Sequence, residues 1–566
     1  MKRLFVICFL FLLGKSILAQ ENHFTFECFD FSVNEQLKSL DGWLNEASFF
    51  TARASLDTTI VRNGKHPLLV SNTFVLSHKI LRYNMQLAIP MPATQADKML
   101  VELSAKSQNI SRVYLVLSGI NTTENILYSD TLFLNGNNDW HTYVKEIQLK
   151  DVVSLHCKMV VFGGDGADNQ KLWLDKMDIR IGTKSIKDSP VPVCFADTSE
   201  VFRQIQPLSF SPPYGYEQIP ILKNKKVIAL GETIHGSATL NRVAMQLIKY
   251  RIETANCKLV LLELPVEHML FVNRFVQGDE RFQLNALKEY LITYSDEFIE
   301  LCKWIKDYNK KTTDKVYLLG YDVPLFRMES PKWVARYLSI LNQERNHLGL
   351  KQMCTQLQNS VDTFEPALQT FQMNNGFKNL LGEKESEILK WWMKNLPRNL
   401  SFQLCFQDRD SNMWKNVEYL MELLSVPEST VTIYTHLGHA NYVSGFPCFR
   451  LNPSMGEYAK KSLKDDYVCV GLCVGGGTFY TADSLPPYFF PVKTLVEPPE
   501  NSLEKILRTR HQESFYMPVS SILTPMYLRY IGNSYVGNQF QFVTPGCRMD
   551  AVIYIDKSEA LKLIGN

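Results

Sequence analysis

The sequence predicts an α/β fold, with a mostly parallel sheet flanked by helices and a helical insertion, preceded by an all-β sandwich or jelly-roll domain. Residues 20–186 alternate short apolar runs with clusters of Asn, Gly, Asp and Ser, which is typical of antiparallel β domains. Over residues 201–566, apolar strand-like runs alternate with helical patterns, which favours parallel strands joined by helices. Residues 187–200 contain Pro190 and Pro192 among polar residues, and we interpret them as a linker.

The β domain is predicted from short runs such as 68–70, 99–103 and 112–117. A further strand opens at Trp140, and residues 172–181 (LWLDKMDIRI) alternate between two faces. The end of this domain is similar to the last strand of carbohydrate-binding-like jelly-roll domains, which implies a glycan as a partner. Aromatic side chains that form core contacts are the more frequent alternative.

The C-terminal domain is predicted from apolar strands separated by helical segments. Helical spacing is found over residues 238–253 and 283–310, and residues 332–425 are mostly helical, which is the expected insertion. The predicted strands cover residues 227–230, 258–264, 316–320, 431–435 and 467–474.

The first nineteen residues have the pattern of a secretory signal peptide. Lys2 and Arg3 precede the apolar run 4–13, which is too short to span a bilayer, and Ala19 is a suitable cleavage position. The alternative is a membrane anchor, although Gly14 interrupts the run early. We therefore expect an exported chain, periplasmic or extracellular, that begins near residue 20 and has no later membrane span.

The charge of the chain is close to neutral. Removal of residues 1–19 removes Lys2, Arg3 and Lys15 and no acid, so the formal charge falls by three from +2 to −1. This gives no electrostatic reason to expect a nucleic acid or an anionic membrane as a partner.

Several common catalytic signatures are missing from the sequence. There is no GxSxG elbow, no HExxH zinc helix and no Walker A loop. A Ser-His-Asp mechanism is therefore not supported.

Histidines and acids instead follow the predicted strands, where ligands bind in open α/β sheets. Glu232 and His235 follow the first strand, within Gly231–Gly236 (GETIHG), where one carboxylate can position one imidazole. Glu263 ends the next strand, and an acid there is costly unless it is paired or functional. His436 and His439 follow the strand 431–435.

Each of these residues also has a structural interpretation. A single histidine at a strand end is more often a structural group than a catalyst. Glu232 would then cap the following helix, and Asp322 would bond to loop amides. The recurrence of His and Glu at successive strand ends favours a functional site.

The ordered series of motifs resembles the erythromycin esterase family over about residues 220–555. The family has an opening Gly-Glu-x-x-His-Gly pattern, a Glu at the end of the next strand and a pair of histidines three residues apart. Further matches are Arg242, Asn273, GYD at 320–322, RDSNMWKN at 409–416, Met455-Gly456, RYIGNSY at 529–535 and Asp550-Ala551.

The sequence departs from the family near the expected pocket. Tyr434, Thr435 and Leu437 surround His436, where the family has Trp and Asn. Thr239 and Leu240 stand in place of an acidic and aromatic pair. These changes weaken the case for a macrolide substrate more than the case for the chemistry.

The resemblance implies hydrolysis of an ester or lactone without a covalent intermediate, and no cofactor is expected. His235 would be the general base toward water, and Glu232 or Glu263 would orient it. His436, His439 and Arg242 would polarise the carbonyl. Substrate-binding residues are expected at Asp322, Asn273 and Tyr434.

Three alternatives remain open at this stage. The same acids and histidines are suitable ligands for a divalent metal, so a metal-dependent hydrolase is one of them. A non-catalytic glycan-binding protein is another. The third is kinship with other GExxH proteins that bind haem or cleave peptides.

Overall fold

The structure is a computed structural model of the chain. It describes residues 33–34, 39–40, 43–46, 52–72, 81–92, 96–134, 136–164, 169–188, 203–209, 213–287, 295–323, 330–343, 346–359, 366, 369, 378, 381–400, 409–424, 428–443, 453–481, 491–500, 502–510, 514–532 and 539–562. The predicted signal peptide 1–19, and the predicted linker 187–200 from residue 189 onward, lie outside the described residues.

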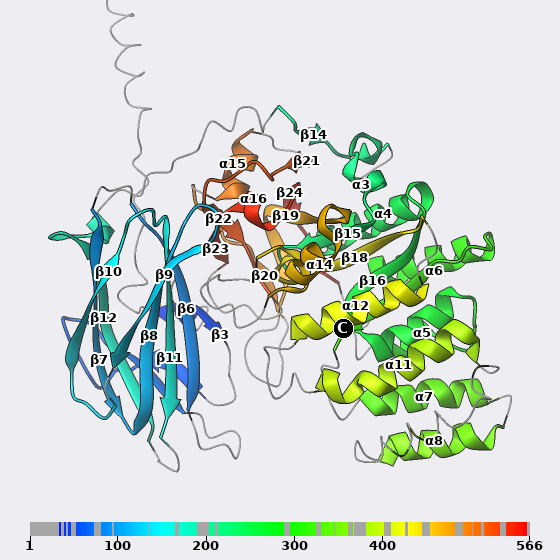
Figure 1. Ribbon diagram of the computed structural model, residues 1–566, viewed down its shortest axis with the longest axis horizontal. Coiled ribbons are helices and arrows are strands. Elements are labelled where there is room, and N and C mark those ends of the chain that lie inside the picture. The colour runs from blue at the N-terminus through cyan, green and yellow to red at the C-terminus, as the bar shows by residue number, and fades with distance from the viewer. Residues whose placement is uncertain are drawn as a thin grey trace, which may run out of the picture.

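The N-terminal part is a sandwich of two antiparallel sheets (Figure 1). One has the order β10-β7-β12-β5-β4 with β13 beside β12, and the other has the order β3-β6-β11-β8-β9. Apolar residues from both sheets, among them Val101 and Leu115, form one buried core. The strands are β3 (Leu44–Glu46), β4 (Ala52–Leu56), β5 (Leu68–Asn72), β6 (Arg82–Pro90), β7 (Lys98–Gln108), β8 (Ile110–Ile120), β9 (Ile126–Leu134), β10 (His141–Gln148), β11 (Ser154–Gly163), β12 (Lys171–Ile181) and β13 (Lys184–Ser185), and β1 (Val33–Asn34) pairs with β2 (Ser39–Leu40).

The C-terminal part is built on a mixed sheet with the order β14-β21-β24-β19-β15-β18-β16-β17, with β20 beside β19. Neighbours from β24 to β17 pair in parallel, whereas β14, β21 and β20 pair antiparallel. The strands are β14 (Gln206–Pro207), β15 (Val227–Glu232), β16 (Cys257–Pro265), β17 (Tyr317–Asp322), β18 (Thr430–His436), β19 (Tyr467–Tyr480), β20 (Val492–Thr494), β21 (Phe515–Pro518) and β24 (Ala551–Ser558).

The predicted combination of an all-β part and an α/β part is confirmed. Among the named strands, parallel pairing is confined to the six from β24 to β17, and the other strand pairings in the described chain are antiparallel. The central strands are almost wholly buried and apolar, as expected for parallel strands covered on both faces.

Helices follow the parallel strands, and in the described residues four of them lie between β17 and β18 as the predicted insertion (Figure 1). These four are α7 (Ser330–Asn342), α8 (Leu348–Asn359), α11 (Glu383–Leu400) and α12 (Arg409–Leu424). The others include α4 (Ala238–Thr254), α5 (Val266–Val276), α6 (Asp296–Lys310), α13 (Leu437–Ala440), α14 (Met455–Leu463), α15 (Leu503–Arg510) and α16 (Pro545–Arg548). In the described part of the chain, none of the helices has the length and apolarity needed to cross a membrane.

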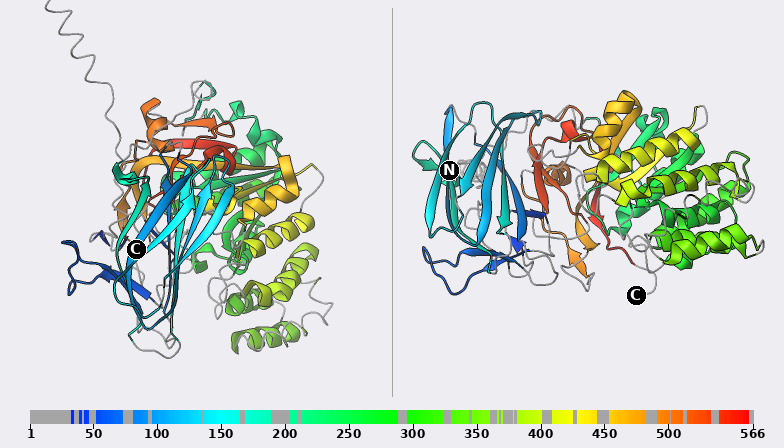
Figure 2. Two further views of the ribbon diagram at one scale, coloured as in Figure 1. Left: turned by 60° about the vertical axis from the view of Figure 1, so that its left-hand side comes forward. Right: turned by 60° about the horizontal axis from the view of Figure 1, so that its bottom comes forward.

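The elements β22 (Met526–Arg529), β23 (Phe540–Val543) and α16 lie between the sandwich and the parallel strands (Figure 2). Strand β23 packs against β6 of the sandwich. The two parts are therefore in direct contact through this C-terminal segment.

Candidate active site

The predicted polar residues meet at the carboxyl ends of four neighbouring parallel strands. Glu232 ends β15, His436 ends β18, and the two residues are register partners. Glu263 lies near the end of β16, and Asp322 ends β17. This is the edge of an open α/β sheet at which ligands bind.

His235 and Glu232 form a hydrogen-bonded pair. His235 Nδ1 lies 2.6 Å from Glu232 Oε1, and Glu232 is almost fully buried. The other oxygen of Glu232 accepts a hydrogen bond from the Tyr434 hydroxyl, which also lies 2.6 Å from Asn241 Oδ1. With Nδ1 engaged, the ring presents Nε2, and the described residues give that nitrogen no hydrogen-bond partner.

Charge around His235 favours its protonated form. Burial acts against protonation, but the carboxylates of Glu232 and Glu263 outweigh it, so the pKa of His235 lies above its usual value. The side chain is 21% exposed, so part of the ring is open to solvent.

The loop that carries His235 requires glycine at position 236. Gly236 has φ +76°, and a Cβ there would lie 1.8 Å from the Tyr480 carbonyl oxygen. The His235 amide donates to the Ile531 carbonyl, which fixes the turn. Ser237 is the N-cap of α4, so the alternative that Glu232 caps this helix is wrong.

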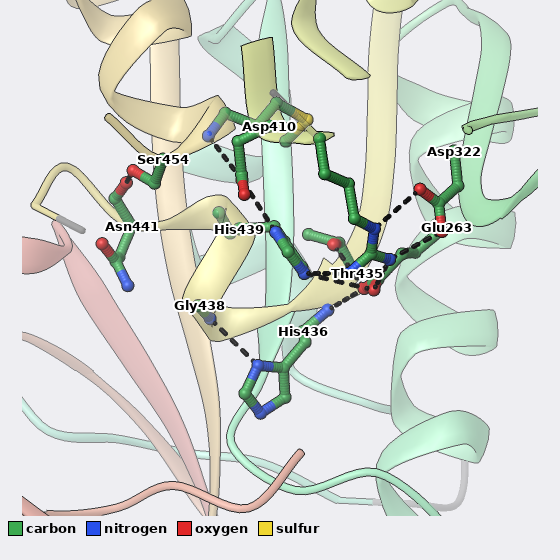
Figure 3. A network of polar contacts seen from close by, with 12 residues as sticks. Glu263, Asp322, Asp410, Thr435, His436, Gly438, His439, Asn441 and Ser454 are labelled. Carbon is green, nitrogen blue, oxygen red and sulfur yellow. Dashed lines mark hydrogen bonds and ion pairs between the residues drawn. The ribbon is translucent and has the colours of Figure 1, made fainter. Parts of the chain in front are cut away.

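Glu263 is the centre of a second network (Figure 3). Its Oε2 accepts hydrogen bonds of 2.7 Å from the Thr435 hydroxyl and from the His436 amide. Its Oε1 accepts from Arg409 Nη2 at 3.0 Å. Burial opposes its ionisation, but the nearby positive charges of His439 and Arg409 prevail and hold the pKa of Glu263 well below its usual range.

Arg409 joins Glu263 to Asp322. Its Nε and Nη2 donate to the two oxygens of Asp322 at 3.0 and 2.6 Å. Burial would lower the pKa of Arg409, but the two acids raise it. Asp322 is 2% exposed and also accepts from the Val323 amide, so it supports Arg409 and a loop amide, and the prediction that it binds substrate is not supported.

His439 has a carboxylate partner of its own. Its Nδ1 lies 2.7 Å from Asp410 Oδ1, and its Nε2 lies 3.1 Å from Arg409 Nη1 and 3.4 Å from Glu263 Oε1. Burial disfavours the charged ring, but Asp410 and Glu263 raise the pKa of His439 above its usual value. The site thus contains two imidazoles, each oriented by one acid.

His436 differs from the other two histidines. Its Nε2 donates to the Ile531 carbonyl at 3.1 Å, and its Nδ1 accepts from the Gly438 amide at 3.2 Å. Burial first, and then the charge of His235, hold the pKa of His436 well below its usual value. The ring is neutral and packs 4.7 Å from the ring of His235, so it is a wall of the site, and the prediction that it polarises a carbonyl is not supported.

Two predicted residues lie away from this cluster. Arg242 faces outward from α4, where it pairs with Glu297 and Glu559 at 3.7 and 3.4 Å. It lines an open groove of about 460 Å³ between α4 and α6. Asn273 is buried on α5, and its side-chain oxygen accepts from the Leu318 amide at 3.4 Å. The predicted carbonyl-polarising role of Arg242 and the predicted substrate contact of Asn273 are therefore not supported.

Three residues of the site were not predicted to act there. Arg409 and Asp410 open α12, and the ring of Tyr530 packs 4.6 Å from the ring of His436. All three belong to segments, 409–416 and 529–535, that contributed to the family resemblance. That was the signal available in the sequence, although it gave no role for them.

The residues do not fit a divalent metal. Within the described ranges, no group of three or more His, Cys, Asp or Glu side chains is arranged to hold one. Both ring nitrogens of His436 are bonded to backbone groups, and Nε2 of His439 faces the guanidinium of Arg409 at 3.1 Å, so neither ring has a nitrogen free for a metal.

Comparison with known proteins identifies one family model and one relative. Residues 392–558, which contain Arg409, His436 and His439, match the family model described as erythromycin esterase. YbfO of Bacillus subtilis (strain 168), which its name provisionally describes as a hydrolase, is 22% identical over 347 residues, or 52% of this chain and 75% of that protein.

Two solved structures are similar in fold. One is a protein from Bacillus cereus, with a TM-score of 0.50 and 16% identity over 65% of this chain and 100% of that chain. The other is a succinoglycan biosynthesis protein, with a TM-score of 0.51, 16% identity and the same coverage. At these identities the likeness shows the fold alone.

Proposed function

We propose, because residues 392–558 match the erythromycin esterase family model, that the chain hydrolyses a carboxylic ester or lactone with His235 as the general base. The observation that carries this proposal is the Glu232–His235 pair at the strand ends, with Nε2 of His235 presented. Neutral imidazole is the side chain best suited to accept a proton near pH 7. The family and the curated relative support a hydrolase, and the ester bond is our proposal.

In the proposed reaction, Nε2 of neutral His235 takes a proton from water while the water oxygen forms a bond to the carbonyl carbon. Glu232 stabilises the imidazolium through Nδ1. The tetrahedral intermediate then breaks its bond to the leaving oxygen, which receives the proton from His235. One ester and one water give one acid and one alcohol.

The second histidine provides positive charge for the developing oxyanion in this proposal. His439 is held by Asp410 and has a raised pKa, so a charged ring is favoured. Both ring nitrogens of His439 face protein groups, so in this proposal the ring acts on the oxyanion through its charge and not as a hydrogen-bond donor. Arg409 fixes Glu263 and Asp322 around it.

The test is turnover of a panel of esters and lactones, macrolides included, by the chain from residue 20. We expect His235→Ala to lower kcat by at least about a hundredfold because it removes the base. His141→Ala, on an exposed position of β10, is the control and keeps wild-type turnover. Wild-type turnover in folded His235→Ala would overturn the assignment.

A chelator separates this mechanism from the metal-dependent alternative. Because the described acids and histidines do not form a metal site, turnover is expected to survive removal of bound metal. If the chelator abolishes turnover and added zinc or manganese restores it, the metal-dependent mechanism is the correct one.

We also propose export and a glycan ligand for the N-terminal domain. Lys2, Arg3 and the short apolar run 4–13 support export through a signal peptide. Processing near residue 20 on expression with a secretion system would confirm it, and retention of the first residues in the mature chain would contradict it. A glycan array with residues 20–186 present in the full chain tests the ligand.

A further inference from the structure

Glu124 is a buried acid on a loop of the sandwich that reaches the C-terminal domain. The residue lies between β8 and β9 and is 4% exposed. Its carboxylate accepts the Thr544 amide at 2.6 Å and Arg548 Nε at 3.0 Å, and Arg548 Nη2 lies 2.9 Å away. Arg548 is 2% exposed, so this is a buried ion pair between the two parts of the molecule.

The loop is built to present this carboxylate. The side-chain oxygen of Asn121 accepts hydrogen bonds from the amides of Thr123 and Asn125 at 3.0 and 2.9 Å. Glu124 itself has φ +58°, a conformation that costs free energy for a residue other than glycine. A loop that only had to connect two strands would have no need of a strained and buried acid.

Arg548 connects Glu124 to the segment that follows His439. The Tyr442 amide donates to the Arg548 carbonyl at 3.0 Å, and Arg548 Nη1 donates to the Val443 carbonyl at 3.5 Å. Tyr442 and Val443 follow α13, which carries His439, after its C-cap residue Asn441. The sandwich is therefore connected to the active-site segment by the Glu124–Arg548 ion pair and by two hydrogen bonds between Arg548 and the backbone of residues 442–443.

We propose that Glu124 is a positioning residue, through which the sandwich acts as a fixed support for the His439 segment of the active site. Loss of the Glu124 charge leaves Arg548 charged and buried without its carboxylate, which is strongly unfavourable. The Arg548 side chain then shifts toward water, and the Val443 carbonyl loses its hydrogen bond from Nη1. The sandwich is in this account a part of the catalytic structure, whatever ligand it also binds.

Hydrogen exchange of the full chain tests this without reference to any substrate. We expect the amides of residues 437–443 to exchange faster in Glu124→Gln than in the wild-type chain. The control is Glu102→Gln, which removes a glutamate paired with Arg180 at 2.9 Å within the sandwich. Equal exchange in all three folded chains would overturn the proposal.

Kinetics supplies the second readout and rests on the proposed ester hydrolysis. Glu124→Gln is expected to lower kcat by about tenfold or more, with a smaller change in KM, because His439 is displaced while substrate contacts remain. Glu102→Gln keeps the wild-type kcat. In Glu124→Gln/Arg548→Gln the loss is smaller than the two single losses combined, because no charge is left unpaired. Wild-type kcat in Glu124→Gln, or fully additive losses, would contradict the proposal, and a wild-type chain without turnover leaves the exchange result to decide.

Discussion

Tyr434 shows how a single hydroxyl controls the acid that orients His235. It bonds to Glu232 and reaches Asn241, although the sequence placed it among the substrate-binding residues. Because a hydrogen bond to a charged group contributes about 1.5–3 kcal/mol, Tyr434→Phe is expected to lower kcat roughly tenfold with the fold intact. Tyr419→Phe also loses a hydrogen bond, to the Glu387 carbonyl at 3.2 Å outside the site, and is the matched control. Equal kcat in the two variants would show that Tyr434 does not act through Glu232.

At Arg409, the planar shape of the guanidinium group matters as well as its positive charge. Its guanidinium makes a two-pronged contact with Asp322 and a third bond to Glu263, which the point charge of lysine cannot reproduce. Arg409→Lys is therefore expected to lose at least about 2 kcal/mol of unfolding free energy, together with most of the turnover. Urea denaturation followed by circular dichroism measures the first effect. A urea midpoint for Arg409→Lys equal to that of the wild type would show that the two-pronged contact with Asp322 does not stabilise the fold.

At the scale of elements, the turn after β15 is the most constrained connection of the site. Gly236 and Gly382 have similar φ values of +76° and +82°, but only a Cβ at 236 would meet backbone atoms. Gly382→Ala is expected to cost roughly 1–2 kcal/mol for the left-handed backbone. Gly236→Ala should cost at least about 2 kcal/mol more, because the Tyr480 carbonyl must move. Thermal unfolding measures the loss of stability in each variant. Equal losses in the two variants would show that a Cβ at position 236 does not clash with the Tyr480 carbonyl.

The strand ends were the part of the site that the sequence could predict. Apolar runs that finish at Glu232, Glu263 and His436 indicate parallel strands, and parallel strands bring their carboxyl ends to one edge. The acid that orients His439 could not be placed in this way. Asp410 follows β17 by more than eighty residues, and only the packing of α12 on the sheet brings it to the site.

The position of Arg242 away from the cluster follows from helical geometry. Leu240, Val243, Ala244 and Leu247 form the buried stripe of α4, so position 242 points to the opposite side. The environment of His436 could not be predicted for a different reason. Its two backbone partners, Ile531 and Gly438, are not visible in any spacing of the sequence.

At the scale of the whole molecule, the buried acid network predicts a pH dependence of stability. The pKa of Glu263 is lowered in the folded chain, so its ionised form stabilises the fold above the unfolded-state pKa of about 4.3. That contribution is lost as the pH falls toward the folded-state pKa. The wild type is therefore expected to exceed Glu263→Gln in unfolding free energy at pH 7, and the difference should shrink below about pH 4. A difference that stays constant with pH would contradict the ionised state of Glu263.

The contact between the two parts predicts how the molecule unfolds. Glu124 and Arg548 are buried together, and β23 packs on β6. The sandwich and the α/β part should therefore unfold in urea as one transition in the wild type, and as two resolved transitions in Glu124→Gln. Two transitions in the wild type would show that the parts are stabilised independently.

The pH dependence of kcat/KM in wild-type and Glu232→Gln chains tests the central claim most directly. His235 must be neutral to accept a proton, and Glu232 raises its pKa, so wild-type activity should fall as the pH drops through a value above the usual 6.5 or so. In Glu232→Gln, the decrease of kcat/KM at acidic pH should occur at a lower pH. The maximal kcat/KM should also decrease, because the imidazolium of His235 has lost its carboxylate partner. If kcat/KM decreases at the same acidic pH in both chains, His235 oriented by Glu232 is not the base of this reaction.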